Sequence, residues 1–142
     1  MGKGGANSRN FFRVDAYIPI ICFPVSSEER DNLFSDLLDK DSVPALRKSP
    51  LKKVDLSGGG ISFETPNRYA TGDLVEINMV LDKVHEGVIV VHGEVVRAEP
   101  LGGSFMLAVK FISVDERIRD LIIRYVFARE REIIAEKRVG WL

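Results

Sequence analysis

The sequence predicts a mainly β domain in which several antiparallel strands close into a small barrel and one C-terminal helix follows. Between residues 51 and 111, short runs of alternating apolar and polar residues are separated by Gly- and Pro-containing turns, a pattern typical of half-buried strands. After residue 113 the apolar period becomes that of an amphipathic helix. Closing a sheet removes its exposed edges, which favours a barrel.

The composition is that of one soluble domain. The chain has 142 residues, of which 45% are hydrophobic and 29% are charged, so it is too apolar to be disordered. Its net charge of −1 disfavours a nucleic-acid polymer as partner. The single cysteine, Cys22, excludes an intramolecular disulfide and a cysteine-based zinc site. The first ten residues lack the core of a signal peptide, and the longest aliphatic run, 88–91, is too short to span a bilayer. We therefore expect a cytoplasmic protein without membrane contact.

The first strand is expected over residues 14–25, after a flexible tail at residues 1–8 that has no apolar anchor. The segment 14–25 is rich in β-branched and aromatic residues, which favour a strand. Pro19 and Pro24 place this strand at a sheet edge or bound its ends, because proline has no N–H to donate to a neighbouring strand.

Residues 26–42 predict a short acidic amphipathic helix inserted between the first two strands. Ser26 and Glu29 fit a capping box. Apolar residues then recur at helical spacing, at Leu33, Phe34, Leu37 and Leu38. The segment has a net charge of −4, and Pro44 is expected to end the helix just before it.

The remaining elements follow from the same two periods. Five more strands are expected, at residues 51–56, 61–65, 74–81, 88–98 and 105–111. Gly93 lies inside one of them and suggests a bulge. Ser113 and Glu116 fit a second capping box, and the helix that it opens is expected to run to about Arg138, with a short tail at 139–142. Its apolar stripe consists of Ile118, Leu121, Ile122, Tyr125 and Val126.

The residues that catalysis requires are missing from the expected places. His85 and His92 are the only histidines, and their spacing matches no helical zinc motif. Ser57 lacks the first glycine of the G-x-S-x-G nucleophile elbow, and the glycines at 58–60 do not extend to a dinucleotide-binding motif. We therefore expect no enzymatic activity, no metal and no cofactor.

Two separated groups of residues suit an anionic ligand that carries a purine. Arg9 and Arg13 offer planar guanidinium groups that bind phosphate, or the O6 and N7 atoms of guanine, through two hydrogen bonds. Asp55 can accept from guanine N–H groups, Ser57 can donate to phosphate, and the glycine run to Gly60 lets a flat ligand approach the backbone. The two arginines alone are typical of a solvated tail. Asp55, Ser57 and Gly60 alone are typical of a β-turn. Together, in this order, they favour a nucleotide site.

These residues resemble the motifs of a known family. The run R9-N-F-F-R13, followed by D55-L-S-G-G-G60, resembles the R-x-x-x-R and [D/N]-x-S-x-x-G motifs of PilZ domains, and the similarity extends over residues 9–128. The resemblance implies a six-stranded antiparallel β-barrel that binds cyclic di-GMP, spanning residues 9–138 with 26–42 as an insertion. It also implies that Arg9 and Arg13 contact guanine and phosphate, and that Asp55, Ser57 and Gly60 line the guanine side.

Three further positions are candidates for ligand contacts. Ser8 precedes the first arginine, where the resemblance implies an influence on whether one ligand or a stacked pair is bound. Gly59 lies within the second motif, and Arg97 lies on a later strand where family members can add a contact. The stretch between the two motifs is longer than is usual in the family, since Arg13 and Asp55 are 42 positions apart. The acidic insertion is expected to lie away from an anionic ligand.

The sequence therefore predicts a non-catalytic cyclic di-GMP receptor whose N-terminal arm closes over the ligand and changes what a protein partner contacts. The resemblance implies a regulated process such as motility, exopolysaccharide export or biofilm formation. The alternative is a PilZ-like adaptor that binds no nucleotide and acts through the acidic helix or the stripe of Phe127 and Ile134. A barrel that binds single-stranded nucleic acid is disfavoured by the net charge. An oligomer contact near Trp141 and Leu142 remains open.

Overall fold

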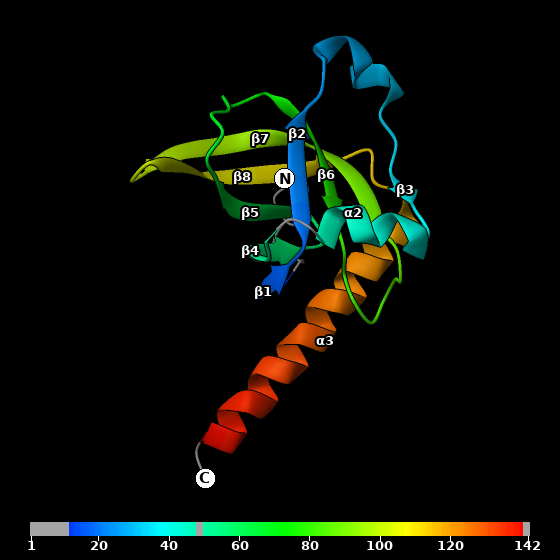
Figure 1. Ribbon diagram of the computed structural model, residues 1–142, viewed down its shortest axis with the longest axis vertical. Helices are drawn as coiled ribbons and strands as arrows, with labels where there is room; N and C mark the ends of the chain where they lie inside the picture. Colours follow the sequence, from blue (N-terminus) through cyan, green and yellow to red (C-terminus); the bar gives the residue numbers. More distant parts are fainter. Residues whose placement is uncertain (1–11, 48–49, 141–142) are drawn as a thin grey trace, which may run out of the picture.

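The computed structural model describes residues 12–47 and 50–140, drawn as ribbons in Figure 1. One sheet of eight strands dominates it, and its neighbouring strands pair antiparallel. The strands are β1 (Arg13–Ile18), β2 (Ile20–Pro24), β3 (Asp36–Leu37), β4 (Lys52–Ser57), β5 (Gly60–Thr65), β6 (Leu74–Met79), β7 (Ile89–Leu101) and β8 (Ser104–Ile112). The helices are the 3₁₀ turns η1 (Ser27–Asn32) and η2 (Lys40–Ser42), α2 (Val43–Arg47) and α3 (Glu116–Gly140).

The sheet curls because its two end strands are neighbours in sequence. The strand order is β1-β4-β5-β8-β7-β6-β2, and β3 pairs separately with β7. Only Pro19 separates β1 from β2, so the single strand expected over 14–25 is wrong. Proline cannot donate to a ladder, and its carbonyl instead accepts from the Val80 N–H at 3.2 Å. The mainly β class with a C-terminal helix is confirmed. The strands number eight rather than six because Pro19 divides the first and β3 is additional.

The core fills the inside of the curled sheet. Inward positions alternate with outward ones along each strand, as on β1, where Val14, Ala16 and Ile18 are at most 3% exposed. The first half of α3 adds Ile118, Ile122 and Val126, which are also buried. Each such side chain stabilises the fold by about 1.5–3 kcal/mol. The later turns of α3 extend away from the sheet (Figure 1).

The start of α3 differs from the expected capping box. The cap is Asp115, whose Oδ1 accepts from the Ile118 N–H at 2.9 Å. Ser113 lies before the helix with a φ of 54°, so it cannot cap it. The Asp115 N–H donates to the Ser35 hydroxyl at 3.1 Å, which ties the inserted segment to α3. The helix ends at Gly140, two residues beyond the expected end. Within the described residues, no helix has both the length and the apolar character that a membrane-spanning helix requires.

The acidic helix expected over 26–42 is wrong. The segment forms η1, the two-residue strand β3 and η2. Helix α2 then begins at Val43 and contains Pro44 in its first turn, so Pro44 does not end a helix here. Short acidic and hydroxyl side chains bond nearby backbone N–H groups instead of leaving them to a helix. Ser26 Oγ accepts from the Glu28 N–H at 3.2 Å, and Asp39 Oδ1 accepts from the Asp41 N–H at 3.0 Å.

Helix α2, directly after the inserted segment, covers the residues that follow β6 and the start of β7. The α2 residues Val43 and Leu46 bury against Val80, Val88 and Val90, and all five are at most 9% exposed. β3 pairs with the start of β7, beyond the point where β8 ends, and so protects that edge.

The bulge in β7 lies three residues beyond the site expected at Gly93. Val95 pairs with Val109 but Arg97 pairs with Ala108, so Val96 is the extra residue. Gly93 has a steric reason instead, because a Cβ there would lie 2.3 Å from Val109 Cγ1.

Candidate functional site

The outward residues of β1, β4, β5 and β8 form two rows across the sheet. The first row contains Arg13, Ser57, Gly60 and Lys110, each opposite the next. The second row contains Asp15, Asp55, Ser62, Ala108 and, on β7, Arg97. Inward neighbours such as Leu56, Ile61 and Val109 are buried, so the strand alternation directs the row residues outward. In the first row the cations Arg13 and Lys110 lie on β1 and β8, and Glu94 of β7 lies opposite Lys110. In the second row the acidic residues lie on β1 and β4 and Arg97 lies on β7.

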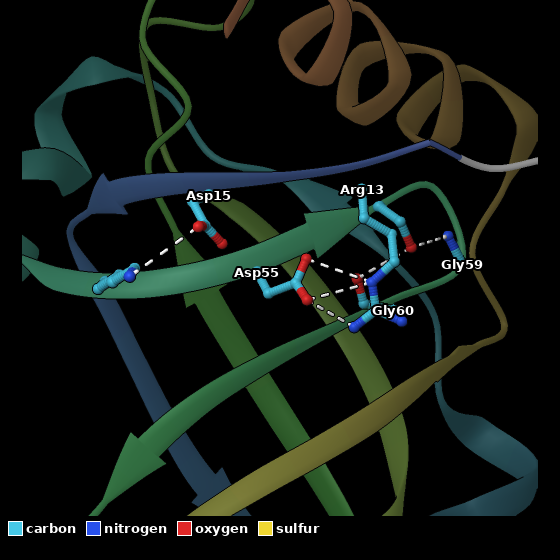
Figure 2. A network of polar contacts seen from close by, with 7 residues as sticks. Arg13, Asp15, Asp55, Gly59 and Gly60 are labelled. Carbon is cyan, nitrogen blue, oxygen red and sulfur yellow. Dashed lines mark hydrogen bonds and ion pairs between the residues drawn. The ribbon is translucent and has the colours of Figure 1, made fainter. Parts of the chain in front are cut away.

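Arg13 and Asp55 form a two-pronged ion pair from adjacent strands (Figure 2). Arg13 Nη2 and Nε lie 2.7 and 3.1 Å from Asp55 Oδ2. The hydrogen bond with Asp55 raises the pKa of Arg13, so the guanidinium stays charged. The side chains are 61% and 36% exposed, and pairs this exposed contribute only about 0–1 kcal/mol to stability. The pair therefore contributes little to folding, and Arg13 is accessible to a ligand.

Asp55 also lies directly opposite Asp15, a cross-strand arrangement of like charges that disfavours the sheet. Arg13 offsets the charge of Asp55, and Lys53 Nζ lies 3.9 Å from Asp15 Oδ2. Figure 2 shows Asp55 beside Arg13, with Asp15 farther from Arg13. A ligand that withdraws Arg13 must therefore supply hydrogen-bond donors to Asp55 in its place.

The turn between β4 and β5 is organised by Ser57. Its Oγ accepts from the Gly59 N–H at 3.2 Å, and the Gly59 carbonyl accepts from the Phe111 N–H at 2.9 Å. Gly60 is required by close packing, because a Cβ there would lie 2.4 Å from the Val109 carbonyl oxygen. This absence of side chains leaves a flat floor between Arg13 and Lys110.

A cleft of about 600 Å³ lies over this floor, within the size range of small-molecule sites. Of the described residues that line it, four are cationic and none is acidic. The four are Arg13, Arg97, Lys110 and Arg119. In a chain with a net charge of −1, this concentration of positive charge favours an anionic ligand.

Helix α3 contacts the same site in three places. Arg119 Nη1 donates to the Gly58 carbonyl at 2.7 Å, which fixes the β4–β5 turn to the first turns of the helix. Arg129 Nε donates to the Asp15 carbonyl at 3.3 Å. Phe12, directly before Arg13, packs edge-on against Phe127 with the ring centroids 5.3 Å apart. A change at the turn or at the start of β1 therefore acts directly on α3.

Most of the candidate residues on the described part of the chain come together. Arg13, Ser57, Gly59, Gly60 and Arg97 line the cleft. Asp55 lies beside it, held by Arg13. Arg9 and Ser8 lie outside the described residues, so their expected roles stay predictions.

Sequence reasoning missed Lys110 and Arg119. The alternation of Phe105, Leu107, Val109 and Phe111 already directs Lys110 outward, but its place opposite Gly60 depends on the pairing of β5 with β8. Arg119 reaches the cleft through the docking of α3, and no local pattern carries that information.

Comparison with known proteins agrees with this geometry at the level of the fold. A solved structure from Xanthomonas campestris, described as a tetrameric PilZ domain self-assembled via a helical bundle, aligns with a TM-score of 0.65 at 13% identity, over 94% of this chain and 97% of that one. The PilZ domain of YcgR from Escherichia coli, solved with c-di-GMP, aligns with a TM-score of 0.53 at 19% identity, over 94% and 98%. A search of curated protein sequences gave no significant match. The family model of the PilZ domain matches residues 7–128, so the chain belongs to the PilZ domain family.

Proposed function

We propose that this protein is a non-catalytic receptor for cyclic di-GMP, which binds in the cleft above the β4–β5 turn. The observation that carries the proposal is the set of four cations that line the cleft with no acidic residue among the described lining residues. Cyclic di-GMP brings two phosphates for these cations and two guanines whose N–H groups suit Asp55. Membership of the PilZ family and the YcgR neighbour solved with c-di-GMP support this choice of ligand.

Binding exchanges one set of contacts for another. Arg13 moves from Asp55 to the ligand, and guanine N–H groups take its place on the carboxylate. Each charge-assisted hydrogen bond contributes about 1.5–3 kcal/mol, and fixing the side chains that make these bonds reduces the total. Because Phe12 directly precedes Arg13 and packs on Phe127, this exchange alters the contact between Phe12 and helix α3. The ligand thereby changes the surface that a protein partner meets.

The test is a calorimetric titration of the full chain with cyclic di-GMP, with GMP and cyclic AMP as controls. We expect a micromolar dissociation constant for cyclic di-GMP and binding at least 100-fold weaker for the two mononucleotides. No heat of binding with cyclic di-GMP at millimolar concentration contradicts the proposal and favours the adaptor without nucleotide binding.

A second proposal concerns self-association through the later turns of α3. Phe127 and Ile134 are 41% and 45% exposed and lie seven residues apart, so they share one face of the helix. The Xanthomonas campestris neighbour is described as assembling through a helical bundle, which supports the same role for this face.

Light scattering of the full chain over a range of concentrations tests this second proposal. We expect Ile134→Glu to shift the distribution towards the monomer. Ala135→Glu introduces the same charge at an exposed neighbouring position, turned by about 100° from the Phe127 and Ile134 face, and should change the mass much less. A wild-type chain that is monomeric at all concentrations contradicts self-association.

A further inference from the structure

The far wall of the cleft is shaped by the bulge in β7. Successive residues of a regular strand point to opposite faces, yet Val96 and Arg97 both line the cleft. The bulge explains this, since Val96 is the extra residue between two paired positions and Arg97 takes the place opposite Ala108. The irregularity therefore places Arg97 on the same wall as Lys110 of β8.

Lys110 is at the opposite end of the first row from Arg13. It pairs with Gly60 on one side and with Glu94 on the other, and its side chain is exposed. Three strand spacings separate it from Arg13, about 14 Å between Cα atoms. Between them lie only the Ser57 hydroxyl and the bare backbone of Gly60, so a flat ligand on this floor lies between two cations.

The charged group of Lys110 differs from the other three in the cleft. Arg13 is paired with Asp55, Arg97 Nε lies 3.3 Å from Glu99 Oε1, and Arg119 donates to the Gly58 carbonyl. Among the described residues, the ammonium of Lys110 has no hydrogen-bond or ion-pair partner. Lys110 can therefore contact an anion without first breaking a bond within the protein.

We propose that Lys110 binds the anionic group of the ligand that lies farther from Arg13, so that the ligand is held between these two cations. The proposal rests on the proposed function for the identity of the ligand. It assigns a role to a residue that lies outside both motifs, and it explains the bulge as the feature that brings Arg97 beside Lys110.

Calorimetric titration of cyclic di-GMP at several salt concentrations tests the proposal with three variants of the full chain. Lys110→Met keeps the apolar stem and removes the charge, and Lys110→Arg keeps the charge. Lys53→Met is the matched control, because Lys53 is an exposed strand lysine of the same sheet that faces Asp15 outside the cleft. Because Lys110 is exposed, all three variants should fold, which their melting curves check.

We expect Lys110→Met to weaken binding roughly tenfold or more and to reduce its dependence on salt. The affinity of Lys110→Arg for cyclic di-GMP should stay within about threefold of that of wild type. The affinity of Lys53→Met should equal that of wild type. Wild-type affinity in Lys110→Met overturns the assignment, as does an equal loss in Lys53→Met, which indicates only a general effect of charge. A wild-type chain that binds no cyclic di-GMP overturns the proposed function and this assignment together. If wild type binds cyclic di-GMP and Lys110→Met binds it equally well, only the assignment of Lys110 is overturned.

Discussion

The two outer faces of this sheet differ in what their outward residues allow. On β6 and β7 the outward position Val90, with Val80 and Val88 beside it, is apolar and is covered by Val43 and Leu46 of α2. On β4, β5 and β8 the outward positions are small, polar or cationic, and none of the described side chains of the segment 26–47 lines the cleft above them. The backbone alternation is the same on both faces. Outward side chains therefore decide which face is buried for stability and which remains open for a ligand.

The largest expected effect is on the covered face. Leu46→Ala removes a side chain that is 3% exposed, and the cavity should lower the free energy of unfolding by about 2–5 kcal/mol. Urea unfolding measures this loss, and titration below the transition should give a cyclic di-GMP affinity within about twofold of wild type. A tenfold loss of affinity in the folded variant means that the two faces are not independent.

Gly60→Ala should affect both stability and binding. Its Cβ meets the Val109 carbonyl oxygen at 2.4 Å, so β5 and β8 must move apart, at a cost of about 1–3 kcal/mol in unfolding free energy. The same methyl group stands on the floor of the cleft and should weaken ligand binding.

Gly103→Ala is the matched control for that substitution. Its φ is +65° and nothing lies within 4 Å of the added Cβ, so it costs only backbone strain of about 1 kcal/mol. Its ligand affinity should equal that of wild type. Equal affinity losses in the two alanine variants, measured by calorimetry, refute the role of Gly60 as the floor.

The smallest expected effect is on the pH dependence of stability, and it comes from Cys22, which belongs to neither outer face. Burial raises the pKa of the Cys22 thiol from 9.0 to about 11. In the unfolded chain the thiol loses its proton first, so its contribution to stability is complete below about pH 9 and is lost as the pH rises towards 11. We expect the melting temperature to fall across this range and to fall less in Cys22→Ala. Parallel melting curves for the two proteins would contradict this assignment.

The strand pattern was predictable because alternation reports directly on burial. Val75, Ile77 and Met79 alternate with outward residues, and they are buried as expected. The break at Pro19 could not be predicted, because proline fits both an unbroken edge strand and a corner between two strands. The corner is visible only from the pairing of β1 with β4 and of β2 with β6. The insertion does not form the expected helix, although Leu37 and Leu38 fit helical spacing. The strand edge with which it pairs instead, at Ile89 of β7, lies 52 residues after Leu37 in the sequence.

The site shows the same division between local and long-range information. Arg13, Asp55, Ser57 and Gly60 stand in two short motifs, so their grouping could be predicted from the chain alone. Lys110 joins them through strand register, Arg97 through a bulge and Arg119 through helix docking. Arg97 is a candidate from the sequence only through the family resemblance, and no local pattern indicates Lys110 or Arg119. The full set of four cations is therefore visible only in the structure.

Two arginines with similar local chemistry give the most direct test. Arg13 pairs with Asp55 on the open face, and its side chain is 61% exposed. Arg30 lies in the inserted segment and pairs with Glu94 of β7 at 3.4 Å, and its side chain is 51% exposed. In calorimetric titrations with cyclic di-GMP, we expect Arg13→Ala to weaken binding about 100-fold while its unfolding free energy falls by less than about 1 kcal/mol, and we expect Arg30→Ala to bind like wild type. Wild-type affinity in Arg13→Ala, or an equal loss in both variants, would contradict this expectation.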